Sequence, residues 1–154
     1  MRRIVFFAFL ILTGCQQASA SPTPSPNDQE LFLMKTIKHY YEVFDQVRAT
    51  NNASLIDSVT DPDGVDRSNT QAFVLQQLQQ NKASITTHEV LSNWKFAMAG
   101  TTATVYYDYQ ASGYDINFQT KQPLESEVTL QPHRDRMDLR RHGNAWLVFN
   151  RQPA

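Results

Sequence analysis

Hydrophobic residues follow two different spacings along this chain, one before Asn81 and another after it. Between residues 29 and 50 they recur every three or four positions, as on one face of an α-helix. These positions are Leu33, Met34, Ile37, Tyr40, Tyr41, Phe44 and Val47. Asn27 and Glu30 have the spacing of a capping box, and Asn51-Asn52 is a suitable stop because asparagine tolerates a left-handed backbone. The pattern predicts a long first helix.

Two shorter helices are expected next. Residues 53–59 would turn three apolar side chains inward: Leu55, Ile56 and Val59. Asp61-Pro62-Asp63-Gly64 indicates a turn. Ser68 and Gln71 form a second capping box, which predicts a helix extending to about Lys82. The expected apolar face of this helix consists of Phe73, Val74, Leu75 and Leu78.

Beyond Asn81 apolar and polar residues alternate, which is the spacing of half-buried β-strands. Strands are predicted over residues 93–98, 102–118, 124–130, 135–141 and 145–150. Ser112-Gly113 indicates a bulge or bend within the second of them. Residues 124–130 are expected to pair with residues 135–141, with Val128 opposite Met137.

The last predicted strand carries apolar groups on both faces, because Ala145–Phe149 does not alternate. With Gly143-Asn144 as a two-residue turn, Phe149 would lie opposite Asp138 and share the outer face with Leu147. Apolar groups on a solvated face are either covered by another segment or form a contact patch. The contact patch, through which a homodimer could form, would consist of Leu147, Phe149, Arg136 and Arg140.

The amino-terminal residues have the features of a secretory signal. Two arginines precede the uncharged run Ile4–Leu12, which is too short to span a bilayer. The run ends in Leu12-Thr13-Gly14-Cys15, which contains the single cysteine of the chain and resembles the lipobox of bacterial lipoproteins. That resemblance implies removal of residues 1–14 and attachment of a diacylglyceryl group, with acyl chains such as palmitate, to Cys15. The alternative is an ordinary signal peptide cleaved near Ala18-Ser19-Ala20.

A tether is expected to follow the signal. Residues 16–26 read QQASASPTPSP, a composition that favours an extended, solvated chain. We expect residues 15–28 to connect the lipid anchor to a globular domain at residues 29–151. Because two or more acyl chains hold a protein stably at a membrane, this domain would lie in the cell envelope. In a Gram-negative host, Gln16 rather than Asp after the cysteine implies the outer membrane, facing the periplasm.

The charge balance excludes one class of partner. Removing Arg2 and Arg3 takes the formal net charge from −1 to −3, whereas nucleic-acid binders are normally strongly basic. With Cys15 acylated, no thiol remains for a disulfide or for nucleophilic catalysis.

The order of helix, short helix, helix and antiparallel strands resembles the nuclear transport factor 2-like superfamily. The closing stretch Arg140–Val148 looks like the last hairpin of that family: a basic residue, a glycine turn, then tryptophan and aliphatic residues. The resemblance implies an α+β fold, with N-terminal helices packed on a curved antiparallel sheet of about four strands, in a cone with an open mouth. The superfamily includes isomerase-like and cyclase-like enzymes and also non-catalytic binding modules, so the fold does not select the function.

Several aromatic residues are candidates for lining the cone cavity: Tyr40, Tyr41, Phe44, Trp94, Phe96, Tyr107 and Tyr109. An aspartate such as Asp45 beside a tyrosine in an apolar cavity could transfer protons. Packing in the core is the simpler interpretation of the aromatic residues. Asp45 lies at the edge of the helical stripe, which favours a solvated carboxylate.

No cofactor or metal site is predicted. The four histidines, expected in turns or on the surface, lack metal-binding spacing: His39, His88, His133 and His142. The three aspartates around Gly64 do not match a calcium loop and are better explained by a turn. The arginines near the C-terminus are expected to be solvated and paired with Glu125 and Glu127, although they could meet an anionic partner.

These observations favour a lipid-anchored envelope protein whose domain binds a ligand or a protein partner without catalysis. The alternative is a small, cofactor-independent enzyme of the isomerase or cyclase type that uses the cone cavity.

The lipobox generates a direct prediction. Cys15→Ser should release the protein from membranes or stall its processing, because the thiol that accepts the lipid is lost. Membrane fractionation and mass spectrometry of the chain would measure both effects, with Ser19→Ala as a matched control that keeps the anchor. An unchanged membrane fraction and unchanged mass in Cys15→Ser would contradict the lipoprotein interpretation.

Overall fold

The computed structural model describes residues 26–154, except for the side chains of residues 26, 27, 90 and 91. The predicted signal, the lipobox and most of the tether therefore lie outside the described residues. Within residues 26–154, neither helix has both the length and the apolar character needed to cross a bilayer.

The first helix, α1, spans Pro26–Thr50 and therefore includes the last three residues assigned above to the tether. It ends where the sequence predicts, because Asn51 adopts a left-handed backbone with φ of 53°. Its inner face is fully apolar or aromatic and supplies the largest share of the core: Leu33, Ile37, Tyr40, Tyr41, Val43, Phe44 and Val47. The helical spacing of the sequence is confirmed.

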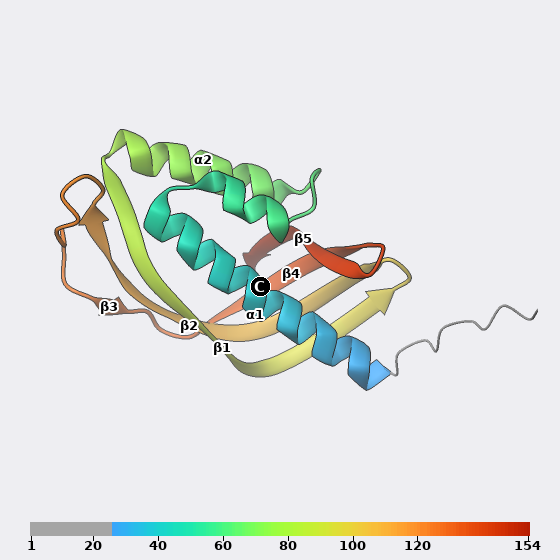
Figure 1. Cartoon of the computed structure of the whole chain (residues 1–154). Helices are drawn as coiled ribbons and strands as arrows, with labels where there is room; N and C mark the ends of the chain where they lie inside the picture. The colour runs from blue at the N-terminus through green and yellow to red at the C-terminus, as the bar shows by residue number, and fades with distance from the viewer. Residues whose placement is uncertain (1–25) are drawn as a thin grey trace, which may run out of the picture.

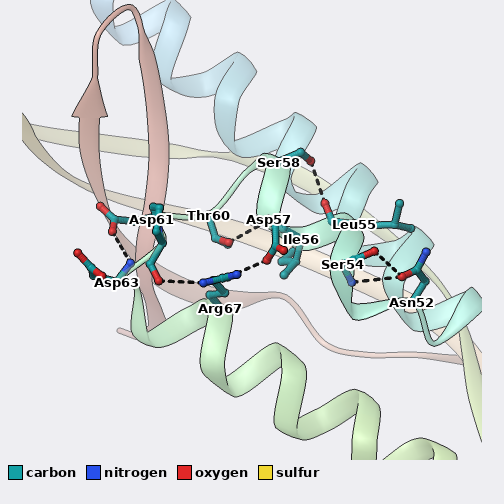
Figure 2. Close-up of polar contacts among 11 residues, drawn as sticks. Asn52, Ser54, Leu55, Ile56, Asp57, Ser58, Thr60, Asp61, Asp63 and Arg67 are labelled. Atoms are coloured by element: carbon teal, nitrogen blue, oxygen red, sulfur yellow. Dashed lines mark hydrogen bonds and ion pairs between the residues drawn. The ribbon is translucent and has the colours of Figure 1, made fainter.

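A short 3₁₀ helix, η1, covers Ala53–Ser58 and is joined to the next helix by the predicted turn (Figure 2). Asp61 forms this turn by accepting bonds from two backbone groups, the amide of Asp63 to its side chain at 2.9 Å and the amide of Gly64 to its carbonyl at 2.8 Å. Arg67 then donates to the Asp57 carboxylate at 2.7 Å. These contacts fix the angle between η1 and the helix that follows.

The next helix, α2, spans Val65–Gln79, so it begins three residues before the predicted cap at Ser68. The predicted apolar face is half right: Val74 is buried and Phe73 packs against the core, whereas Leu75 and Leu78 are 61% and 43% exposed. The fully buried positions lie four residues apart, and Val74 shares them with two residues that were not predicted, Asp66 and Thr70. Two of these are polar, and Asp66 finds its partners inside the protein, so hydrophobic spacing alone could not identify this face.

One antiparallel sheet forms the second layer (Figure 1). Its strands are β1 (Lys82–Ala99), β2 (Thr102–Asn117), β3 (Val128–Thr129), β4 (His133–His142) and β5 (Ala145–Pro153). The order is β1-β2-β4-β5, with β3 paired to β2. The sheet curves strongly and the helices lie over its concave face. The predicted α+β architecture, helices packed on a curved antiparallel sheet with four principal strands, is confirmed.

The predicted strand over residues 124–130 is mostly wrong. Only two of its residues form a strand, and Val128 lies opposite Gly113 of β2 rather than opposite Met137. Met137 lies opposite Val105, because β4 pairs directly with β2. The apolar side chains Leu124, Val128 and Leu130 are about half exposed. These alternating residues therefore belong to a segment at the border of the sheet, and they do not form a strand that packs in the core.

The expected irregularity at Ser112-Gly113 lies on the partner strand instead. The β1–β2 register shifts between Val90 and Lys95, where Asn93 has a φ of 58°, whereas Gly113 pairs regularly with Thr86. Glycine is needed at position 113 for a different reason. A Cβ there would lie 2.3 Å from the carbonyl oxygen of Ile85, so the two strands approach more closely than a side chain permits.

The last hairpin differs from the prediction at one position. The register shifts beside Asp138, which pairs with Asn150 rather than with Phe149. Phe149 occupies this bulge, and the guanidinium carbon of Arg140 lies 3.6 Å from the centroid of its ring. Every residue after Phe149 therefore faces the opposite side from the one expected of regular pairing.

The close approach at Gly113 leads to a stability prediction. Gly113→Ala should lower the free energy of unfolding by about 1–3 kcal/mol, because the new methyl group must push the backbone of β1 away. Urea unfolding followed by circular dichroism would measure it. Ser112→Ala, at the neighbouring position, is the control and should change stability little. Equal stability of the two variants would contradict the tight contact.

Candidate functional site

A cavity of about 460 Å³ lies beneath the C-terminal half of α1 and against β1 and β2, at the end of the sheet that carries β3. Its border combines aromatic, cationic and apolar side chains, among them Phe44, Arg48, His88, Tyr109, Leu130 and Arg151. It is bounded on the outer side by the segment before β4, through Glu125, Val128 and Leu130. We call it the cone cavity.

His88 and Asp45 form a pair on the cavity wall. The Nδ1 atom of His88 lies 2.5 Å from Asp45 Oδ1, and the same carboxylate accepts from the Thr86 hydroxyl at 3.0 Å. The His88 ring also stacks on Tyr41, with centroids 4.7 Å apart. The prediction of a surface histidine is wrong here, since the side chain is 4% exposed, and Asp45 is not a freely solvated carboxylate.

Two guanidinium groups reach the same cavity. Arg151 lies above the Phe44 ring, 4.5 Å from its centroid. Arg48 packs between Phe44 and Phe73, at 5.7 and 5.2 Å from their centroids, and its buried Nε has no hydrogen-bond partner. Burial lowers the pKa of the Arg48 guanidinium, an effect that the charge of Asp45 opposes.

Arg151 also belongs to a buried polar network below the cavity. Its Nε lies 3.7 Å from Asp66 Oδ1, and the Tyr40 hydroxyl donates to Asp66 Oδ2 at 2.7 Å. Burial raises the pKa of Asp66, while the charge of Arg151 and the Tyr40 bond act in the other direction. The network thus ties together α1, α2 and β5.

A second branch of this network involves Tyr41, Tyr107 and Asp135. The two phenol oxygens are 2.9 Å apart, and Tyr41 donates to Asp135 at 3.3 Å. Burial raises the pKa of both tyrosines and of Asp135. The tyrosines are at most 2% exposed, so these hydroxyls bond to one another and do not face the cavity.

The seven aromatic candidates therefore divide into three groups. Phe44 and Tyr109 border the cavity. Tyr40, Tyr41 and Tyr107 form its buried support. Trp94 and Phe96 stack on each other, with centroids 6.0 Å apart, and do not border this cavity.

Sequence reasoning missed His88, Arg48 and Arg151 as cavity residues. Arg151 was expected on the solvated face, where regular pairing would have placed it opposite Arg136. The bulge at Phe149 instead places it opposite Met137, which is fully buried. The sequence contains one weak signal for Arg48: it is four residues after Phe44 and therefore lies on the same face of the helix.

Three of the other C-terminal arginines, Arg134, Arg136 and Arg140, have acidic partners, but these are not the predicted glutamates. Arg134 pairs with Asp108 at 2.9 Å and Arg136 with Asp138 at 3.0 Å. Asp61 lies 2.9 Å from His142, apart from the Asp66 network. Across residues 26–154, no three histidine or acidic side chains gather closely enough to hold a metal ion.

A smaller hollow, of about 360 Å³, lies at the other end of α1. Phe32 and Trp146 form its apolar wall, and Asp28 and Arg141 its polar border. It lacks the paired histidine and the two guanidinium groups that distinguish the larger cavity.

The Asp66 branch yields a testable prediction. Tyr40→Phe should lower the free energy of unfolding by about 1–3 kcal/mol, because a buried carboxylate loses a hydrogen-bond donor. Since the hydroxyl favours the charged form of Asp66, the loss should be larger near about pH 7 than near about pH 3. Urea unfolding at both pH values would measure it. Tyr106→Phe is the control, and equal losses at both pH values would contradict the role of the bond.

Comparison with known proteins identifies the fold. No family model and no curated protein sequence matches this chain. Solved structures do match it in fold, and three of them illustrate the similarity. A nuclear transport factor 2-like protein from Salmonella enterica is 11% identical, with a TM-score of 0.58, over 84% of this chain and 92% of the other.

The other two come from different bacteria. The β subunit of benzoate 1,2-dioxygenase from Burkholderia mallei is 14% identical, with a TM-score of 0.55, over 85% and 90% of the two chains. A nuclear transport factor 2-like protein with a cystatin-like fold from Novosphingobium aromaticivorans is 14% identical, with a TM-score of 0.50, over 81% and 80%. On these similarities, residues 26–154 have the nuclear transport factor 2-like, cystatin-like cone fold.

Proposed function

We propose that this is a lipid-anchored protein of the cell envelope whose cone cavity binds a small ligand without transforming it. The anchor is supported by the lipobox at Leu12-Thr13-Gly14-Cys15 and by the proline-rich stretch that follows it. The binding role is supported by a cavity whose wall combines aromatic and aliphatic side chains with several polar and charged groups, so that it can both hold and orient a ligand.

The burial of the three tyrosine hydroxyls beneath the cavity is the observation that carries the non-catalytic assignment. The phenols of Tyr40, Tyr41 and Tyr107 would be the natural proton donors of such a cone, but each is bonded internally and nearly or fully buried. Their raised pKa values also keep them neutral. A group that cannot reach a ligand cannot exchange a proton with it.

The His88–Asp45 pair favours the second candidate function. A histidine held by a carboxylate at a cavity wall is an arrangement suited to general acid–base catalysis. The pair would be the catalytic centre of a cofactor-independent isomerase or cyclase. Because the same carboxylate also accepts from Thr86 and from the His88 amide, we assign it a structural role in holding β1 against α1.

A partner protein or a second copy of the chain could bind at the contact patch defined above. Leu147 and Phe149 are each partly buried, and Arg140 covers the Phe149 ring. This cover reduces the apolar surface that the patch offers, so we place ligand binding in the cavity first.

Fragment binding observed by NMR would test the cavity. The protein would be the full chain carrying Cys15→Ser, which keeps residues 26–154 intact. The probes would be a mixture of small aromatic acids, amides and alcohols. The amide signals of Thr86, His88 and Tyr109 should shift, and Ser112→Trp should abolish the shifts by filling the cavity. Gln119→Trp, on an exposed turn away from the cavity, should leave them unchanged.

Mass spectrometry of the same mixtures would separate the two functions. We expect every bound fragment to be recovered unchanged. A product that forms with the unmodified cavity and not with His88→Gln would establish the enzyme, and an absence of shifts at the cavity would refute the binding role.

A further inference from the structure

Arg48 is a cation without a counter-ion. It lies half-buried at the cavity border between two phenylalanine rings, and no carboxylate of residues 26–154 lies within ion-pair distance of it. The nearest charges are already engaged, since Asp45 holds His88 at 2.5 Å and Asp115 accepts from Ser84 at 2.7 Å. A partly buried charge without a partner has lost some of its hydration without gaining an ion pair, so an anion entering the cavity would stabilise it.

Arg151 strengthens the positive potential at the same place. Its guanidinium borders the cavity from beneath, although Asp66 at 3.7 Å already balances part of its charge. Arg48 is therefore the group left free to form the direct contact. Its planar fork matches the two oxygens of a carboxylate, which can accept two parallel hydrogen bonds.

The rest of the border limits the charge of the ligand. Asp115 and Glu125 lie on the same cavity, and their carboxylates would repel a compact multivalent anion such as phosphate. A single negative charge at one end of the ligand would satisfy Arg48 while staying clear of both acidic groups.

The border also provides a surface for an apolar body. Phe44 and Tyr109 present rings on one side, while Val128 and Leu130 lie on the rim and are 53% and 48% exposed. Exposed aliphatic groups beside a cavity lose contact with water when an apolar ligand covers them. The Arg48 cation and an apolar surface thus border the same cavity.

We propose that the cavity binds an organic monocarboxylate, with its carboxylate on Arg48 and its apolar body between Phe44, Tyr109 and the Val128–Leu130 rim. This assignment rests on the proposed ligand-binding function and specifies the class of ligand. It makes Arg48 the residue that selects an acid over a neutral molecule of the same shape.

Calorimetric titration with a matched pair of probes tests the assignment. The probes are 3-phenylpropanoate and its neutral amide, 3-phenylpropanamide, titrated into the full chain carrying Cys15→Ser. The acid should bind at least about tenfold more tightly than the amide. Arg48→Gln should remove this preference and leave amide binding unchanged. Arg48→Lys, which keeps the charge but loses the fork, should restore part of it.

Arg136→Gln serves as the control, because Arg136 pairs with Asp138 and does not border the cavity. It should leave acid binding unchanged. Equal binding of acid and amide, or full acid binding by Arg48→Gln, would overturn the carboxylate assignment while leaving the cavity as a ligand site. Binding of inorganic phosphate as tight as that of the acid would overturn it by removing the need for an apolar body. Binding of neither probe would also overturn it, and the fragment screen would show separately whether the cavity accepts any ligand.

Discussion

The placement of Arg151 inside the protein is the interaction on which the rest of the structure depends. Its guanidinium contacts the carboxylate of Asp66 from α2 and the Phe44 ring from α1, while its own strand, β5, belongs to the sheet. One side chain therefore joins the two helices to the sheet. Breaking a buried ion pair by removing one partner typically costs about 3–5 kcal/mol, because the other charge is left without compensation. Electrostatics thus determines how these layers fit together, in addition to apolar packing.

The sequence predicted the parts of the fold that depend on regular spacing. The inner face of α1 and the end of that helix at Asn51 follow from local periodicity and local backbone preference. Positions that depend on tertiary pairing were missed. The buried face of α2 includes Asp66 because that carboxylate is paired with Arg151, and Arg151 faces inward because a bulge at Phe149 reverses the alternation. The spacing of residues within α2 or within β5 does not reveal that Asp66 and Arg151 pair with each other.

The cavity residues likewise divide into those that the sequence predicted and those that depend on tertiary pairing. Phe44 and Tyr109 were found by their aromatic character, whereas His88 was not. The part of β1 that contains His88 is rich in polar and small residues, so nothing in its spacing distinguishes an inward position from an outward one. Only the pairing of β1 with β2 and the contact with Asp45 on α1 define that position.

The irregularities in β1 and β5 also matter because these two strands form the edges of the sheet. An open edge strand exposes unpaired backbone groups to which a foreign strand can add, and this is a common route to aggregation. On β5, Val148 exchanges backbone bonds with Val59 and Asp61, so this edge is partly closed by the chain itself. The other edge, β1, is interrupted between Val90 and Lys95, where the backbone turns out of register. Neither edge of the described sheet is therefore open and regular along its whole length, which leaves less backbone with which a foreign strand can pair.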